Sequence, residues 1–239
     1  CVTMGTITTR VLETKRERLL VTLLLALAIP CSAQLGVVMG MLGSISLAAT
    51  MIWGGVVMLV LLAVGWLAAK LVPGERTQLL VELPPMRLPV ASNVIFKTLA
   101  RLEWYLKEVV PLFLVGTAIL FILDKTSMLA MISNVGKPLV SGWLGLPPEA
   151  SVHFLMGFLR RDFGATGLFI MQQQGLLSPA QVIVSMVTIT LFIPCVASVM
   201  IIKKERSWHT SLGIVVLVFG LAFLVGGLLR YALLFFGWS

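Results

Sequence analysis

A thiol directly follows a proline at two places in this sequence. Residues 27–33 and 191–197 share the pattern L-x-I-P-C-x-A, whose cysteines are Cys31 and Cys195. Proline lacks a backbone donor and clashes with the carbonyl group four residues before it, so each segment is predicted to be a broken helix. The freed carbonyl oxygens must then bind protein, water or a permeant ion. Thiols beside such oxygens could bind a transition-metal cation transiently, or they could serve only as small residues for close packing.

Pro30 and Pro194, the prolines of this pattern, both lie in apolar segments that are long enough to cross a bilayer. The chain has 239 residues, of which 59% are hydrophobic and only 12% charged, and its mean hydropathy is +1.03. Residues 19–69 and 163–202 contain no Asp, Glu, Lys or Arg. A span needs about 20 apolar residues, so the sequence predicts an all-α polytopic integral membrane protein.

The basic residues lie at the ends of these apolar runs rather than in one patch. The formal net charge is +8, but this distribution favours contact with the lipid bilayer and argues against nucleic acid as a partner. Three cysteines without a C-x-x-C motif give no disulfide framework. The first residue, Cys1, is preceded by neither an initiator Met nor a signal sequence, so we expect the chain to be part of a longer one.

The Lys and Arg distribution also predicts how the chain crosses the membrane. Residues 10–18 are expected on the cytoplasmic side, followed by an outward span over 19–42. A turn at Gly43 and Ser44 then leads to an inward span over 45–71.

The next segment is too polar to cross the membrane. Residues 73–108 are predicted to form a cytoplasmic linker and an interfacial amphipathic helix, with Glu103 and Lys107 as an i,i+4 pair. The apolar residues 109–123 then carry the chain outward. A single tilted transmembrane helix explains the same pattern equally well.

Short apolar runs interrupted by glycine and proline follow. Residues 126–176 are predicted to form half-helices or re-entrant hairpins, because their runs are too short for full spans. Two spans over 178–202 and 211–236 come next, and the basic cluster at 203–206 makes the first of these run inward. The two proline-cysteine copies are therefore antiparallel, as in the inverted repeats of secondary transporters.

Three adjacent ionisable residues lie within the segment GFLRRDFGATG, at Arg160, Arg161 and Asp162. Ionisable groups at membrane depth usually face a partner or a cavity. Asp162 could pair with an arginine and hold a re-entrant hairpin, or it could face a cation pathway while the arginines anchor at the headgroups. The first interpretation is preferred, because two adjacent positive charges would repel a divalent cation in an open pore. His153 is expected to be a helix contact rather than a ligand.

Other polar and soft side chains are weaker candidates. Ser32, Gln34 and Ser198 follow the two cysteines and could offer oxygen ligands, although such residues more often bond a neighbouring helix. The 12 methionines are scattered, which does not suggest a Cu(I) pathway.

Several of these segments together resemble the FeoB family of ferrous iron transporters. They are TRVLETKRERLL followed by IPCSAQL, ELPPMRLP followed by NVIFKTLARLEWYLKE, GFLRRDFGA, and LFIPCVAS. The resemblance implies a C-terminal-type membrane segment with two transmembrane helices at 1–72, the linker and amphipathic helix at 73–108, and a second gate-type region at 109–239. The chain is similar to the C-terminal half of a FeoB membrane domain, which implies an inverted-repeat gate architecture.

The resemblance also implies a function. It implies that Fe²⁺ is the transported substrate, that no cofactor is bound tightly, and that Cys31, Cys195 and Cys1 line a transient pathway in the inner (cytoplasmic) membrane. The chain lacks a G-x-x-x-x-G-K-[ST] motif, so GTP and Mg²⁺ would bind only through an N-terminal GTPase domain outside it. That domain and a first gate region are the expected partners, a homo-oligomer is compatible, and no enzymatic activity is expected of the chain itself.

Two other functions fit the sequence pattern. A nucleoside or organic-solute carrier of similar gate architecture would need polar side chains and aromatic stacking in its cavity. A non-transporting membrane scaffold would use the repeated pattern for packing only.

Overall fold

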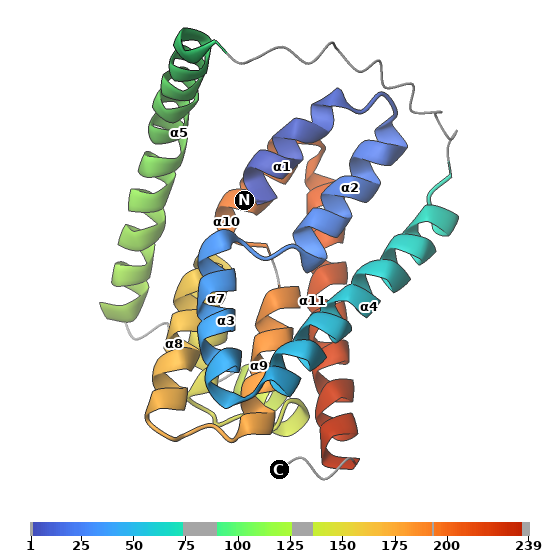
Figure 1. The fold of residues 1–239 in the computed structure, drawn as a ribbon, viewed down its shortest axis with the longest axis vertical. Helices are drawn as coiled ribbons and strands as arrows, with labels where there is room; N and C mark the ends of the chain where they lie inside the picture. The colour runs from blue at the N-terminus through green and yellow to red at the C-terminus, as the bar shows by residue number, and fades with distance from the viewer. Residues whose placement is uncertain (1, 74–89, 126–135, 193, 236–239) are drawn as a thin grey trace. The chain divides into compact units, whose positions relative to one another are not determined.

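The computed structural model of the chain describes residues 2–73, 90–125, 136–192 and 194–235. All regular structure within these residues is helical, which confirms the predicted all-α class (Figure 1). Cys1 and most of the predicted linker lie outside the described residues. The elements are α1 (Val2–Thr8), η1 (Thr9–Val11), α2 (Lys15–Ala28), α3 (Ser32–Ile45), α4 (Leu47–Leu71), α5 (Ala91–Lys125), η2 (Pro138–Trp143), α7 (Ala150–Leu159), α8 (Arg161–Gln173), α9 (Pro179–Leu191), α10 (Val196–Glu205) and α11 (Trp208–Phe235).

The chain divides into two compact units, one made of Cys1–Glu75 with Leu129–Ser239 and one made of Arg76–Met128. The second unit holds α5, which is continuous from Ala91 to Lys125 with Pro111 inside it. The amphipathic and apolar segments expected on either side of residue 109 therefore share one helix. Lys107 donates to Glu103 at 2.6 Å, as predicted for this i,i+4 pair.

Among its described residues, the first unit contains three segments that are long and apolar enough to cross a membrane. They are Lys15–Ile45, Leu47–Leu71 and Trp208–Phe235. At 1.5 Å per residue, the 25 residues of α4 extend about 38 Å, which exceeds the hydrocarbon core of a bilayer. The turn before α4 differs from the prediction, because α3 continues through Gly43 and Ser44. The turn lies at Ser46, whose hydroxyl caps α4 by accepting from the Ala49 amide.

Both proline-cysteine segments interrupt a helix, as predicted. At the first copy the backbone is extended at Ile29 and Cys31, between α2 and α3. At the second it is extended at Phe192 and Cys195, between α9 and α10. Figure 1 shows the chain descending through α2 and α3 and rising through α9 and α10. The two copies thus run in opposite directions.

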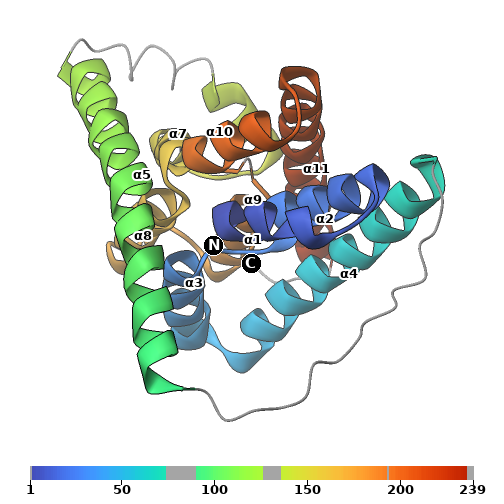
Figure 2. The ribbon, with the colours of Figure 1, turned by 90° about the horizontal axis from the view of Figure 1, so that it is seen from above.

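The core of the first unit is built around α9. Every side chain from Val182 to Leu191 is buried, and α9 contacts α2, α3, α4, α8 and α11. Figure 2 shows α9 between α3 and α8 on one side and α4 and α11 on the other. Ser178 and Gln181 form a reciprocal capping box and Pro179 occupies the first turn, which fixes where this helix begins. With 13 residues, α9 is too short to span a bilayer alone.

A tight hairpin of two short helices explains the glycines of GFLRRDFGATG. Helices α7 (Ala150–Leu159) and α8 are joined by the single residue Arg160. They cross at Gly157 and Gly164, where a side chain on Gly164 would lie 2.7 Å from the Gly157 Cα. A side chain on Gly167 would meet the His153 imidazole more closely still. The short helices in the described residues of this segment agree with the predicted half-helices.

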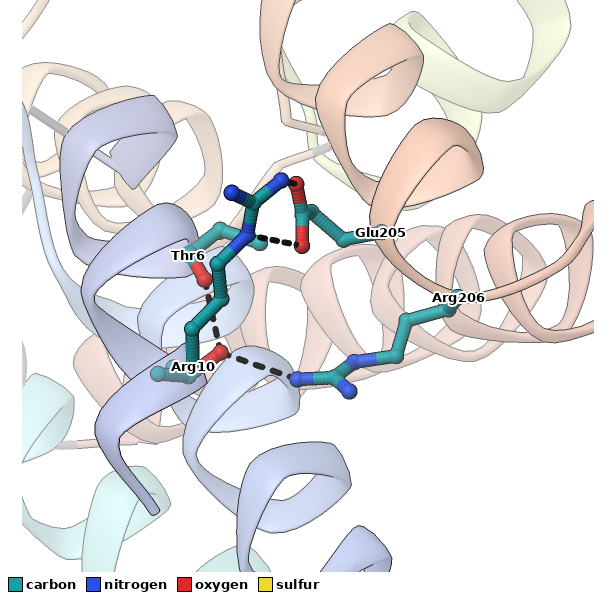
Figure 3. A network of polar contacts seen from close by, with 5 residues as sticks. Thr6, Arg10, Glu205 and Arg206 are labelled. Carbon is teal, nitrogen blue, oxygen red and sulfur yellow. Dashed lines mark hydrogen bonds and ion pairs between the residues drawn. The ribbon is translucent and has the colours of Figure 1, made fainter.

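A polar network joins the two halves of the first unit at one end (Figure 3). Arg10 of η1 donates from Nε to the Glu205 carboxylate at 2.9 Å, and a second bond completes a bidentate pair. Arg206 donates to the Thr9 hydroxyl at 2.8 Å, and that hydroxyl donates to the Thr6 carbonyl oxygen. The start of α2 and the end of α10 therefore lie at the same end of the unit.

The end of α4 lies near the start of α2 as well. Arg16 in the first turn of α2 donates to the Ala69 carbonyl oxygen near the end of α4. At the opposite end of α3, Gln172 of α8 donates to the Met41 carbonyl oxygen and to the Ser44 hydroxyl. The basic residues of α2, α4 and α10 thus gather at one end, as a positive-inside bias requires.

Candidate functional site

The two cysteines occupy equivalent positions at the helix breaks. Cys31 is the N-cap of α3 and Cys195 is the N-cap of α10, so each thiol lies at the start of a helix. Each follows its proline, Pro30 or Pro194, by one residue, and both thiols are free and half-buried. The repeated sequence pattern therefore corresponds to a repeated local structure.

Arg161 connects the two breaks. Its Nη2 donates to the Ala26 carbonyl oxygen at 2.7 Å and to the Phe192 carbonyl oxygen at 2.8 Å. Its Nη1 donates to the Ile29 carbonyl oxygen at 3.3 Å. Ala26 lies four residues before Pro30, so its oxygen is the acceptor that proline leaves without a helical donor. One guanidinium thus satisfies backbone oxygens at the ends of both α2 and α9.

The last turn of α9 receives two further side chains from the first half of the chain. Gln34, in the first turn of α3, donates from Nε2 to the Ile189 carbonyl oxygen at 3.2 Å. Trp53 of α4 donates to the Thr190 hydroxyl at 3.2 Å. A helix end leaves its final carbonyl groups without intrahelical donors, so the Gln34 contact stabilises the broken end of α9. The Trp53 contact connects α4 to the same turn.

The three ionisable residues of the α7–α8 hairpin have different surroundings. Arg161, the first residue of α8, is only 4% exposed. Arg160 instead donates from Nε and Nη2 to the two oxygens of Asp162, at 3.0 and 2.6 Å. The Arg160 guanidinium also lies 4.6 Å from the centre of the Phe163 ring. The arginine partner of Asp162 is therefore Arg160, and Arg161 is the residue that reaches the breaks.

Each cysteine sulfur has a polar neighbour one helical turn ahead. Cys31 Sγ accepts from the Gln34 backbone N–H at 3.4 Å, and Cys195 Sγ lies 3.3 Å from the Ser198 hydroxyl. Both thiols are also close enough to Arg161 for electrostatic interaction with its guanidinium. The structure thus brings both sequence-predicted thiols to the same buried arginine.

The polar groups around the breaks include one acceptor that is not hydrogen-bonded. Gln34 is fully buried, and its Oε1 has no hydrogen-bond partner among the described residues. Ser32, another candidate oxygen ligand, is exposed. Within residues 2–73, 90–125, 136–192 and 194–235, no three His, Cys, Asp or Glu side chains gather as a metal site would require.

His153 lies in the hairpin rather than at the breaks. Its ring packs against Gly167 and its buried Nδ1 has no hydrogen-bond partner among the described residues. The expected helix contact is present, without a hydrogen bond at this nitrogen. Cys1, the third thiol predicted from the sequence, lies outside the described residues.

The sequence reasoning did not predict the roles of Arg161 and Gln34 at the breaks. The prolines indicated that carbonyl oxygens would need donors, and Arg161 is a multi-donor cation inside an otherwise apolar region. That combination is the signal that could have found it. Gln34 indicates the same kind of contact, because a side-chain amide in an apolar helix usually forms a hydrogen bond with a neighbouring helix.

Comparison with known families gives two matches along the chain. The family described as "Nucleoside recognition", the Gate family, matches residues 106–208. The family described as "Ferrous iron transport protein B C terminus" matches residues 50–101. Both are typical of the FeoB membrane region. Together they agree with the resemblance of the chain to the FeoB family of ferrous iron transporters. Neither the comparison with curated proteins nor that with solved structures gives a match.

The two matches cover different parts of the geometry described above. The Gate match includes the α7–α8 hairpin and the second break at Cys195, whereas the first break at Cys31 precedes both matches. The matched families indicate a membrane transporter region, and the three apolar segments long enough to cross a membrane agree with a multi-pass protein. Its Gate region is helical, in agreement with the short and broken helices described above.

Proposed function

We propose that this chain carries Fe²⁺ across the cytoplasmic membrane as the C-terminal part of a FeoB-type permease. The observation that carries the proposal is the convergence of two antiparallel proline-cysteine breaks on one buried residue, Arg161. Inverted repeats with interrupted helices surround the substrate in secondary transporters. The FeoB C-terminal match supports ferrous iron as the substrate class.

Cys31 and Cys195 supply the soft ligands in this proposal. Fe²⁺ accepts thiolate, imidazole and carboxylate or carbonyl ligands, and a transport site must release its ion readily. Two thiols at helix starts, each beside a polar group, offer a small and incomplete ligand set of this kind. Cys1 is proposed as a further ligand on the same route.

The orientation follows from the basic end of the first unit. That end includes Arg10, Arg16 and Lys70 together with the end of α10, and it is proposed to face the cytoplasm. A GTPase domain outside this chain would bind GTP and Mg²⁺ and act on the permease from that side. A first gate region and a second copy of the protein are further proposed partners.

Uptake by the full-length protein in proteoliposomes tests the substrate. We expect radiolabelled Fe²⁺, kept reduced, to accumulate in the vesicles and to be unaffected by an excess of nucleosides. Met51→Leu is a suitable control variant because the Met51 side chain is 68% exposed on α4 and the substitution changes neither charge nor hydrogen bonding. Nucleoside uptake, or Fe²⁺ uptake no greater than in empty vesicles, would contradict the proposal.

A nucleoside carrier is the second candidate, because the Gate family carries the description "Nucleoside recognition". Four aromatic rings lie beside the second break, and three of them, Phe154, Phe192 and Phe223, are buried. Phe219 completes the cluster, with its ring centre 4.7 Å from that of Phe223. These rings pack on one another, in tilted or edge-to-face pairs. The cluster is therefore a packed core rather than an open stacking surface, which favours the iron proposal.

A further inference from the structure

We infer that the carbonyl oxygens of Ala26, Ile29 and Phe192 form a cation site that the guanidinium of Arg161 occupies in this conformation. A transported cation would enter the site only by displacing that guanidinium. The identity of the transported cation rests on the function proposed above. The existence of the site rests on the geometry alone.

The geometry is that of a cation surrounded by carbonyl oxygens. Two oxygens lie 2.7 and 2.8 Å from Nη2 of Arg161, and a third lies 3.3 Å from Nη1. Ala26 and Ile29 belong to the first break, and Phe192 belongs to the second. Broken helices of transporters coordinate ions through such unwound carbonyl groups. Here a side chain that is 4% exposed holds the place of the ion.

A second observation concerns a buried acceptor next to the end of α9. Gln34 Oε1 is fully buried and has no hydrogen-bond partner among the described residues. A buried acceptor without a donor is unfavourable, and a cation beside it would supply the missing interaction. The same side chain already holds the Ile189 carbonyl oxygen at the second break, so its amide lies between the two copies.

Charge makes the two occupants mutually exclusive. Arg161 remains protonated in proteins, so its guanidinium and a divalent cation repel each other strongly in a medium of low dielectric constant. Arg161 begins α8 directly after the one-residue link between α7 and α8. The α7–α8 hairpin is therefore the element that would withdraw the guanidinium when a cation binds.

Thermal unfolding of the purified full-length protein, titrated with Mn²⁺, tests the inference without measuring transport. Arg161→Met keeps an unbranched apolar stem but removes the charge and all donors. We expect this variant to unfold at a lower temperature than the wild type. Mn²⁺ should then stabilise it saturably, with a midpoint at least tenfold lower than in the wild type. Arg230→Met is the matched control, because Arg230 also donates to backbone carbonyl oxygens, those of Gly142 and Trp143 in η2. It should respond to Mn²⁺ as the wild type does.

The inference is overturned if Mn²⁺ raises the unfolding temperature of all three proteins equally. It is also overturned if added guanidinium, but not Mn²⁺, restores the unfolding temperature of Arg161→Met. The wild type provides a second measurement should Arg161→Met fail to fold. Modification of arginines by phenylglyoxal, followed by mass spectrometry, should label Arg161 at least threefold faster with saturating Mn²⁺. Arg160 is the internal control, and unchanged protection of Arg161 would also overturn the inference.

These readouts separate the inference from the proposed function. Stabilisation of Arg161→Met by Mn²⁺ without Fe²⁺ uptake would support the cation site and contradict iron transport. Fe²⁺ uptake without any specific effect of Mn²⁺ on Arg161→Met would contradict only the role given to Arg161.

Discussion

The Arg161 guanidinium donates to the carbonyl oxygen of Ala26, the acceptor that Pro30 leaves without a helical partner. The same nitrogen donates to Phe192 at the second break. Proline breaks in membrane helices are tolerated where neighbouring groups satisfy the freed backbone. In this chain one side chain does so for both copies of the repeated pattern, which couples the two breaks physically.

The crossing of α7 and α8 is predicted to be intolerant of a single added methyl group. A Cβ on Gly164 would lie 2.6 Å from the His153 carbonyl oxygen and 2.7 Å from the Gly157 Cα. Because these are backbone atoms, Gly164→Ala must separate the helices, and we expect a loss of about 1–3 kcal/mol in unfolding free energy. Thermal unfolding in detergent measures this loss.

Gly36→Ala is the control for that prediction. Gly36 lies in α3 and a Cβ there would have no neighbour within 4 Å. The substitution should be neutral or stabilising by about 0.5–1 kcal/mol, since alanine loses less backbone entropy in a helix. Equal destabilisation by Gly36→Ala and Gly164→Ala would contradict the proposed close crossing.

The Asp162 pair is predicted to contribute modestly to stability. The Asp162 side chain is 19% exposed and that of its partner Arg160 is 38% exposed, so solvent weakens their attraction. Asp162→Asn should therefore lower the unfolding free energy by about 1 kcal/mol or less. A variant that folds with wild-type stability but loses Fe²⁺ uptake would instead place Asp162 on the cation route.

The Arg10–Glu205 pair predicts a pH dependence of stability. The hydrogen bond from Arg10 holds the pKa of Glu205 below its ordinary value of 4.5. A carboxyl group with a lowered pKa stabilises the folded state above its unfolded pKa, and this contribution disappears as the pH falls through its folded pKa. The melting temperatures of the wild type and Glu205→Gln should therefore differ at pH 7 and converge below pH 4.5. A difference that grows on acidification would contradict this assignment.

The predicted membrane topology can be tested with single cysteines introduced at positions 43 and 204. Met41 and Ser44 are hydrogen-bonded to Gln172 at one end of the first unit, whereas Glu205 lies in the polar network at the other. A membrane-impermeant thiol reagent added outside should label position 43 and spare position 204. Equal labelling of both positions would contradict the antiparallel arrangement in the membrane.

Composition and proline chemistry were sufficient to predict much of this architecture. The long apolar runs predicted the spans, and Pro30 and Pro194 predicted the breaks, because both effects are local properties of the chain. The α3–α4 turn was misplaced, since Gly43 and Ser44 fit inside a helix and the capping hydroxyl belongs to Ser46. The donors for the freed carbonyl oxygens depend on tertiary packing. A proline shows that an acceptor is freed but not which distant side chain will reach it.

The central claim is that Cys31 and Cys195 act on one cation, and a double-mutant cycle on Fe²⁺ uptake tests it most directly. The full-length protein would carry Cys31→Ser, Cys195→Ser or both, in proteoliposomes, with Met51→Leu as the control. Serine is nearly isosteric with cysteine but a poorer ligand for a borderline cation, so each single variant should lower the initial rate about tenfold. If the thiols share one site, the double variant should lose much less than the product of the two single losses. Wild-type uptake by the double variant would contradict the claim and return both thiols to a packing role.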